Sequence, residues 1–156
     1  MAEQRLLRVV LPDESPLPNP YAEADRSQAV ADLLAGNIFD PVGLPEGPYA
    51  LHLEVRDGRL VLDIRDRSDA PLRIIALALG PFRRLIKDYH MVVASHEQAV
   101  TEGGSEARIQ AIDMGRRGLH NEGAELLAER LGGRIRVDFE TARRLFTLVC
   151  ALHQRI

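Results

Sequence analysis

Hydrophobic and polar residues alternate most clearly between residues 49 and 65. In 49–56 an apolar side chain falls on every second position, and the same alternation returns in 60–65 after Asp57-Gly58. A period of two places the apolar side chains on one face of a strand. Asp-Gly suits a two-residue hairpin turn, because both positions tolerate positive φ. With a third strand at 72–79, the pattern predicts an antiparallel meander that is covered on one face only.

Helical spacing of apolar residues predominates on both sides of this meander. Before it, residues 5–11 predict a strand, the prolines up to residue 20 predict an extended connector, and 22–35 predicts a helix. After it, Pro81 suits the first turn of a helix that runs to about residue 100. The remaining predicted elements are helices at 105–116 and up to Leu131, a strand at 134–137 and a helix at 139–153.

The predicted order of elements is β-α-βββ-α-α-α-β-α. This order favours an α+β fold in which an antiparallel β-meander carries helices packed on one face. The chain has 156 residues, which is the usual size of one domain. We therefore expect a single domain over residues 1–156, with the strand and proline-rich connector of 1–20 at its edge.

Composition narrows the class of protein. Hydrophobic residues make up 46% of the chain and the net charge is −3, values typical of a soluble globular protein. No apolar run approaches the ~20 residues of a membrane helix, and the first residues lack a signal-peptide pattern. The single cysteine, Cys150, cannot form an internal disulfide, which favours the cytoplasm. Without a strong basic excess, nucleic acid is not an expected partner.

Three segments carry a family resemblance: GPFRRLIKDY at 80–89, IQAIDMGRRGLHNEG at 109–123 and VDFETARRLFTLVC at 137–150. Together they resemble a family of small alphaproteobacterial proteins described only as an uncharacterised protein family. The similarity extends from about residue 22 to the C-terminus, with Gly80 where the family is expected to have threonine. The resemblance implies a bacterial cytoplasmic protein, and it brings no catalytic residues because the family has no established activity.

Arg83 and Lys87 are the first candidates for binding an anion. They lie four residues apart near the start of a predicted helix, so they share a face and repel each other. Cations are also disfavoured at the positive end of a helix. Either an acidic side chain of the meander, such as Glu54, Asp63 or Asp66, lies opposite them, or a phosphate or carboxylate ligand does.

Two other arginine pairs have acids nearby in the sequence. Glu140 precedes Arg143 and Arg144 by three and four residues, and Asp113 precedes Arg116 and Arg117 in the same way. Acid-first spacing of this kind stabilises a helix. A solvated charged face therefore explains the first pair sufficiently, whereas Arg116 and Arg117 stay candidates for anion binding.

The second candidate site is the segment GRRGLHNEG at 115–123, which predicts a polar turn between two helices. His120 and Glu122 are weak candidates for acid–base catalysis, and Asn121 is a further candidate for anion binding. The structural alternative is that Gly118 ends one helix and Asn121 caps the next. No metal-ligand spacing and no cofactor motif is present.

The helix at 139–153 is apolar on nearly all sides, which is typical of a central helix or of an interface. A homodimer or another protein contact through it is therefore an alternative to burial. Since no catalytic set is recognisable, the function is unknown and we favour a non-catalytic interaction or regulatory protein over an enzyme. The alternative is a binder or enzyme for a small phosphorylated or carboxylated metabolite, with an arginine-lined anion site.

Overall fold

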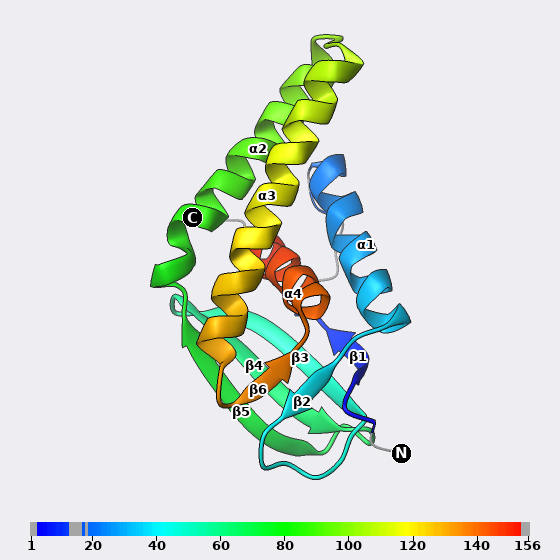
Figure 1. Ribbon diagram of the computed structural model, residues 1–156, viewed down its shortest axis with the longest axis vertical. Coiled ribbons are helices and arrows are strands. Elements are labelled where there is room, and N and C mark those ends of the chain that lie inside the picture. Colours follow the sequence, from blue (N-terminus) through cyan, green and yellow to red (C-terminus); the bar gives the residue numbers. More distant parts are fainter. Residues whose placement is uncertain (1–2, 13–16, 18, 154–156) are drawn as a thin grey trace.

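The computed structural model describes residues 3–12, 17 and 19–153 and confirms the α+β fold (Figure 1). The strands are β1 (Leu6–Val10), β2 (Phe39–Pro41), β3 (Tyr49–Arg56), β4 (Arg59–Asp66), β5 (Pro71–Ala78) and β6 (Ile135–Val137). The helices are α1 (Pro20–Ala35), the short 3-10 turn η1 (Gly80–Phe82), α2 (Arg83–Thr101), α3 (Glu106–Leu131) and α4 (Phe139–Leu152).

The predicted meander is present as β3, β4 and β5. Asp57 and Gly58 form its first turn with φ of 52° and 72°, as the sequence predicted. β1 joins the edge of this sheet in parallel to β3, so the sheet is mixed, with the order β1-β3-β4-β5. One face is buried under the helices, through Leu51, Leu53, Leu60, Leu62, Ile64, Ile75 and Leu77.

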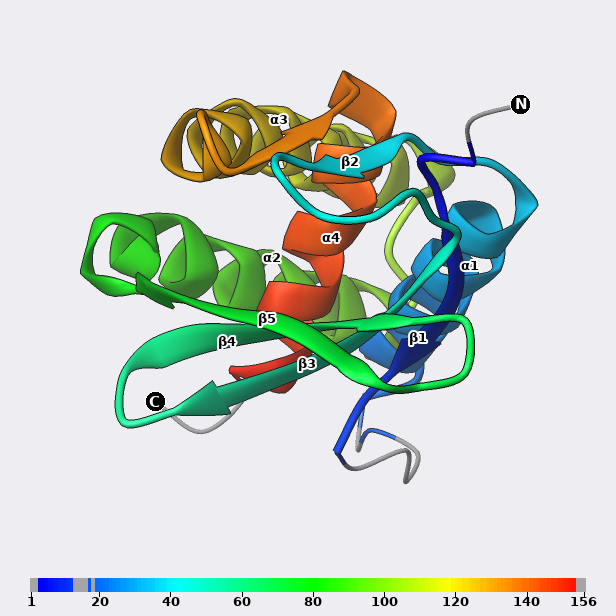
Figure 2. The ribbon, with the colours of Figure 1, turned by 90° about the horizontal axis from the view of Figure 1, so that it is seen from below.

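The helices pack on this one face, and α4 runs through the middle of the helical layer (Figure 2). Residues Thr141, Ala142 and 145–151 of α4 are buried within the chain. Burial in the fold therefore accounts for the apolar character of the 139–153 segment. Since the apolar side chains of α4 are buried within the chain, they no longer support a homodimer through this helix, which stays a prediction.

α3 corrects the predicted order of elements. It is one continuous helix of 26 residues, so the turn predicted at 115–123 is wrong and the chain has one long helix fewer than expected. Glycine within a helix costs roughly 0.5–1 kcal/mol relative to alanine. Burial of His120, Ala124 and Leu127 in the packed helical layer outweighs that cost, since most helical stability in proteins comes from tertiary packing.

A second difference is β2, which the sequence pattern did not predict. It is only three residues long and pairs in antiparallel with β6, about a hundred residues later in the chain. Arg136 Nη2 of β6 donates to Asp40 Oδ2 of β2 at 2.6 Å. A strand this short has no readable period, and its partner is distant in sequence, so local pattern could not reveal it.

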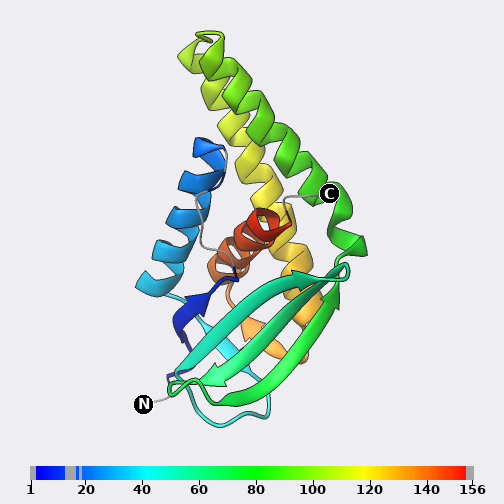
Figure 3. The same cartoon turned by 180° about the vertical axis from the view of Figure 1, so that it is seen from behind.

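α2 and α3 form a helical hairpin that projects beyond the sheet and the other helices (Figures 1 and 3). Its tip is Gly103-Gly104, and Gly103 adopts a φ of 67°, which glycine allows without steric cost. Among the described helices, none is long and apolar enough to cross a membrane.

Candidate functional site

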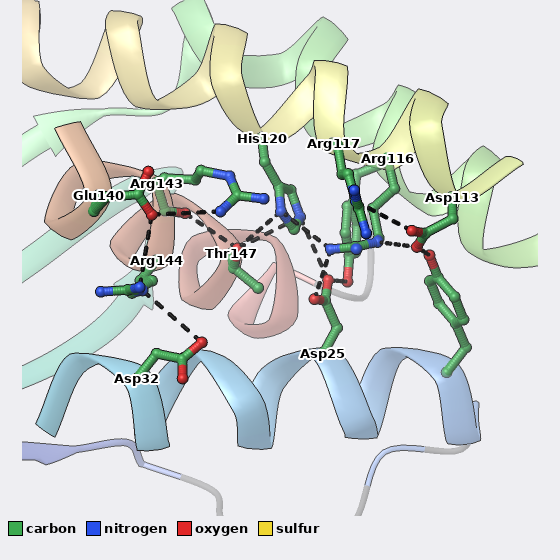
Figure 4. A network of polar contacts seen from close by, with 12 residues as sticks. Asp25, Asp32, Asp113, Arg116, Arg117, His120, Glu140, Arg143, Arg144 and Thr147 are labelled. Atoms are coloured by element: carbon green, nitrogen blue, oxygen red, sulfur yellow. Dashed lines mark hydrogen bonds and ion pairs between the residues drawn. The ribbon is translucent and has the colours of Figure 1, made fainter. Parts of the chain in front are cut away.

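α1, α3 and α4 enclose a pocket of about 260 Å³ (Figure 4). All of its lining residues except Ala29 have polar or charged side chains, although it lies beside the hydrophobic core. α1 contributes Asp25, Gln28, Ala29 and Asp32; α3 contributes Arg116, Arg117 and His120; α4 contributes Arg143, Arg144 and Thr147. The pocket therefore joins two of the three arginine pairs of the sequence with carboxylates from a distant helix.

Asp25 is the centre of a buried polar network at one end of the pocket. Its Oδ1 accepts a hydrogen bond from Arg116 Nη1 at 3.0 Å, and its Oδ2 accepts one from Tyr89 Oη at 2.7 Å. His120 Nε2 lies 3.4 Å from the same Oδ2. Only 13% of the Asp25 side chain is exposed. Both of its oxygens are therefore already occupied by the protein.

Burial and hydrogen bonding shift the pKa of Asp25 in opposite directions. Burial alone would raise the pKa of this carboxyl group. The hydrogen bonds from His120 and Tyr89 and the charge of Arg116 outweigh burial and hold the pKa of Asp25 below its usual value. In Tyr89, burial and the adjacent carboxylate raise the pKa of the phenol. Asp25 is thus ionised and Tyr89 is a neutral donor over the physiological pH range.

Arg116 is fully engaged in this network. Its Nε donates to Asp113 Oδ1 at 2.9 Å, and that oxygen also accepts from Tyr21 Oη at 2.8 Å. The hydrogen bond from Arg116 lowers the pKa of Asp113 despite partial burial. With Asp25 on its other side, Arg116 has two carboxylate partners. We interpret it as a structural cation that joins α1 to α3.

Asp25, His120 and Thr147 have the residue types of a nucleophilic triad but not its geometry. Thr147 Oγ1 lies 3.4 Å from both ring nitrogens of His120, so it stands beside the ring rather than in line with one nitrogen. Its hydroxyl donates to the carbonyl of Arg143 at 3.1 Å. An activated hydroxyl would instead donate to the base. His120 also stacks on Tyr89, with ring centroids 5.6 Å apart, and this arrangement supports a packing role.

Arg143 is the least engaged arginine of the pocket, because its guanidinium makes no hydrogen bond to a described residue. Its side chain is only 26% exposed, and its one ion pair, with Glu140, is 3.6 Å long. Its Nε is buried with no hydrogen-bond partner. Arg144 is held more firmly: its Nη1 donates to the carbonyl of Gly36 at 3.4 Å, and it lies 3.6 Å from the same Glu140 and 3.9 Å from Asp32. The half-exposed carboxylate of Glu140 is therefore shared by two arginines and lies beyond hydrogen-bonding distance of both.

The sequence-predicted site residues separate into two groups. Arg116, Arg117 and His120 line the pocket. Arg117 is 63% exposed at the rim, and its Nε lies 3.2 Å from Asp113. Asn121 and Glu122 are exposed on the outer side of α3, where Glu122 pairs with Arg84 of α2 at 3.1 Å. Because α3 is continuous, its neighbouring residues face in different directions and do not converge on one turn.

Arg83 and Lys87 lie outside the pocket, exposed at the start of α2. Within the part of the chain that the structure describes, neither makes an ion pair. The acids that were expected opposite them are used elsewhere. Asp63 binds Arg65 at 2.8 Å, and Glu54 pairs with Arg56 at 2.9 Å, while Asp66 accepts backbone amides of its own turn.

Residues from α1 and α4 complete the site, and the sequence reasoning had set them aside or overlooked them. Asp25, Ala29 and Asp32 recur at helical spacing, which places both carboxylates on the same face of α1 as a buried alanine. This helical spacing is the sequence feature that could have revealed the contribution of α1 to the site. No group of three or more histidine, cysteine, aspartate or glutamate residues among those described could hold a metal ion. Burial raises the pKa of the Cys150 thiol, which disfavours a thiolate nucleophile.

The fold and the pocket define an α+β protein with a polar, arginine-lined pocket within its helical layer. The chain belongs to the uncharacterised protein family UPF0262, whose pattern matches residues 3–155. It is 60% identical over 165 residues to a UPF0262 protein of Granulibacter bethesdensis, covering 99% of this chain and 93% of the relative. A relative from Rhizobium meliloti is 48% identical over 151 residues, with 97% and 95% covered. No solved structure matches this chain.

Proposed function

We propose that this protein binds a small metabolite through an anionic group, a carboxylate or a phosphate, in the pocket between α1, α3 and α4. The observation that carries the proposal is Arg143, a guanidinium that is three-quarters buried, has no side-chain hydrogen bond among the described residues and faces the pocket. Arg144 lines the same pocket, and Arg117 at the rim adds a further guanidinium. Arg116 and Asp25 form a rigid, already satisfied end.

The guanidinium of Arg143 has hydrogen-bond donors that the protein does not use. A guanidinium carries five N–H donors in a planar fork that matches carboxylate and phosphate oxygens. A buried donor without an acceptor costs about 1–3 kcal/mol. Local violations of this kind occur mainly where function requires them. Oxygens of a bound anion would supply the acceptors that Glu140, at 3.6 Å, does not.

The size and chemistry of the pocket favour a binder of a small molecule over an enzyme. A volume of about 260 Å³ is below the ~300–1,000 Å³ of typical drug-sized sites. The only hydroxyl in the lining, Thr147, donates to a backbone carbonyl. We also expect a cytoplasmic location, since Cys150 is a free, buried cysteine.

Arg143→Met tests the proposal. In a thermal-shift screen of small carboxylates and inorganic phosphate, the wild-type protein is expected to be stabilised by at least one compound, and Arg143→Met is expected to abolish that shift. The unliganded variant is expected to be as stable as wild type or up to about 1 kcal/mol more stable, because the substitution removes an unsatisfied buried cation. Gain of stability with loss of binding distinguishes a ligand-binding residue from a structural one.

Arg83→Ala is the matched control. Arg83 is an exposed arginine outside the pocket, so its removal is expected to leave both the ligand-induced shift and the stability unchanged. If Arg83→Ala abolished the shift and Arg143→Met did not, the anion site would lie at the start of α2 and the pocket assignment would be wrong.

A second candidate function, protein–protein interaction, is favoured by the projecting α2–α3 hairpin. Met91, Val100 and Met114 are each more than half exposed on its two helices, and large apolar side chains exposed on a projecting element are candidates for protein contacts. If the hairpin mediates self-association, light scattering will give a multiple of the monomer mass, and Met114→Glu will restore the monomer. A monomeric wild-type chain at high concentration would exclude self-association through this surface.

A further inference from the structure

We infer that the ligand of the pocket is a zwitterion of the α-amino acid class, with its carboxylate on Arg143 and its ammonium group on Asp32. This inference rests on the proposed anion-binding function and adds the chemical class of the ligand. Three observations carry it: the charge balance of the pocket, the Asp32 oxygen that accepts no hydrogen bond from a described residue, and the volume of the pocket.

The charge balance argues against a polyanion. Four arginines line the pocket with two aspartates, Asp25 and Asp32. The two further acids that pair with the same arginines, Asp113 and Glu140, cancel the remaining positive charge. A site with no net charge accommodates a ligand with no net charge best, because an added di- or trianion would leave uncompensated charge in a partly buried space.

Asp32 supplies the negative pole of the site. Its Oδ1 accepts a hydrogen bond from Gln28 Nε2 at 2.8 Å. The nearest cation to its Oδ2 is Arg144 Nε at 3.9 Å, beyond hydrogen-bonding distance. The side chain is 40% exposed, so it is accessible to a ligand. Asp25 cannot take this role, because Arg116 and Tyr89 occupy its oxygens.

Asp32 of α1 and Arg143 of α4 line the same pocket. In Figure 4, Asp32 rises from α1 and Arg143 lies above it on the side of α3 and α4. Between Asp32 and Asp25, which are two helical turns or about 10 Å apart along α1, Ala29 lines the pocket with only a methyl group. At ~30 Å³ per water-sized group, 260 Å³ holds on the order of nine non-hydrogen atoms. This is the size of a small α-amino acid.

Calorimetry with the full chain tests the class of ligand. The probes are the common proteinogenic L-amino acids, the matched acids without the amino group (propionate for alanine, succinate for aspartate) and inorganic phosphate. We expect at least one amino acid to bind about tenfold or more tightly than its matched acid, a difference of roughly 1.4 kcal/mol. Asp32→Asn is expected to bring the two affinities close together while carboxylate binding persists, and Arg143→Met to abolish both.

Asp88→Asn is the matched control, since Asp88 is a similarly exposed acid, 38% exposed, that pairs with Arg84 away from the pocket. It is expected to keep the preference for the amino acid. If wild type bound matched acids or phosphate as tightly as amino acids, the zwitterion inference would be overturned. The proposal that the pocket binds an anionic group would still be supported. A preference that survived Asp32→Asn would remove Asp32 from the site. If no probe bound, both proposals would be wrong.

Discussion

Replacing Gly123 with alanine is expected to destabilise the protein by about 2 kcal/mol, although alanine is the better helix former. Gly123 lies in the middle of α3, and a Cβ atom at this position would overlap the ring of Phe146 on α4. Overpacking of a core typically costs ~1–3 kcal/mol or more, and the gain in helix propensity returns only about 1 kcal/mol. The clash is severe, so we place the cost of overpacking at about 3 kcal/mol, which leaves a net effect of about 2 kcal/mol.

Phe146 has little freedom to move away. It is fully buried, stacks on Phe82 with ring centroids 6.3 Å apart and meets His120 edge-on at 6.4 Å. The same close approach of α3 to α4 brings His120 next to Thr147 at the base of the pocket. A bulkier residue at position 123, such as valine, is therefore expected to open the pocket as well as destabilise the fold.

Urea denaturation of Gly123→Ala alongside Gly115→Ala and Gly118→Ala measures this effect with its own controls. No atom lies within 4 Å of a Cβ built at either control position, and both glycines are inside α3. Their replacement is expected to stabilise the protein by about 0.5–1 kcal/mol each. Destabilisation by Gly118→Ala would instead indicate a turn at this point, contrary to the continuous helix.

The meander could be predicted because its signals are local. Alternation in β3 and β4 and the Asp57-Gly58 turn depend only on neighbouring residues, and the structure has both. The same local reasoning failed at 115–123, where Gly118 and Asn121 resemble a helix end and a new cap. The segment is helical because Gly123 and its neighbours pack against α4. Residues of α4 lie far along the chain, so local sequence could not reveal this contact.

The candidate site could be predicted only in part, for a related reason. Arg116 and Asp25 are 91 residues apart, and no spacing rule connects them. Arg143 and Arg144 were set aside because Glu140 precedes both at the favoured spacing. The structure shows that this glutamate is half exposed and 3.6 Å from each arginine. A favourable sequence spacing permits an ion pair, but it does not ensure that the pair satisfies a buried cation.

Asp25→Asn is expected to cost about 3–5 kcal/mol at neutral pH, the usual effect of removing one partner from a buried charge pair. The variant leaves Arg116 with Asp113 alone and places an amide group against donors from Tyr89 and His120. Since Arg116 keeps one carboxylate, we expect a value near the lower limit. Asp88→Asn, which breaks the exposed pair with Arg84, is expected to cost at most ~0.5 kcal/mol.

The pH dependence of this difference identifies the charge as its cause. Because the pKa of Asp25 is lower in the folded protein than its usual value, ionised Asp25 stabilises the fold above the unfolded-state pKa of about 4. That stabilisation is lost as the pH falls through the lower pKa of the folded state. The free-energy difference between wild type and Asp25→Asn, measured by urea denaturation, is therefore expected to be largest near pH 7 and to shrink towards pH 3. A difference that stayed constant with pH would mean that packing of the side chain, rather than its charge, joins α1 to α3.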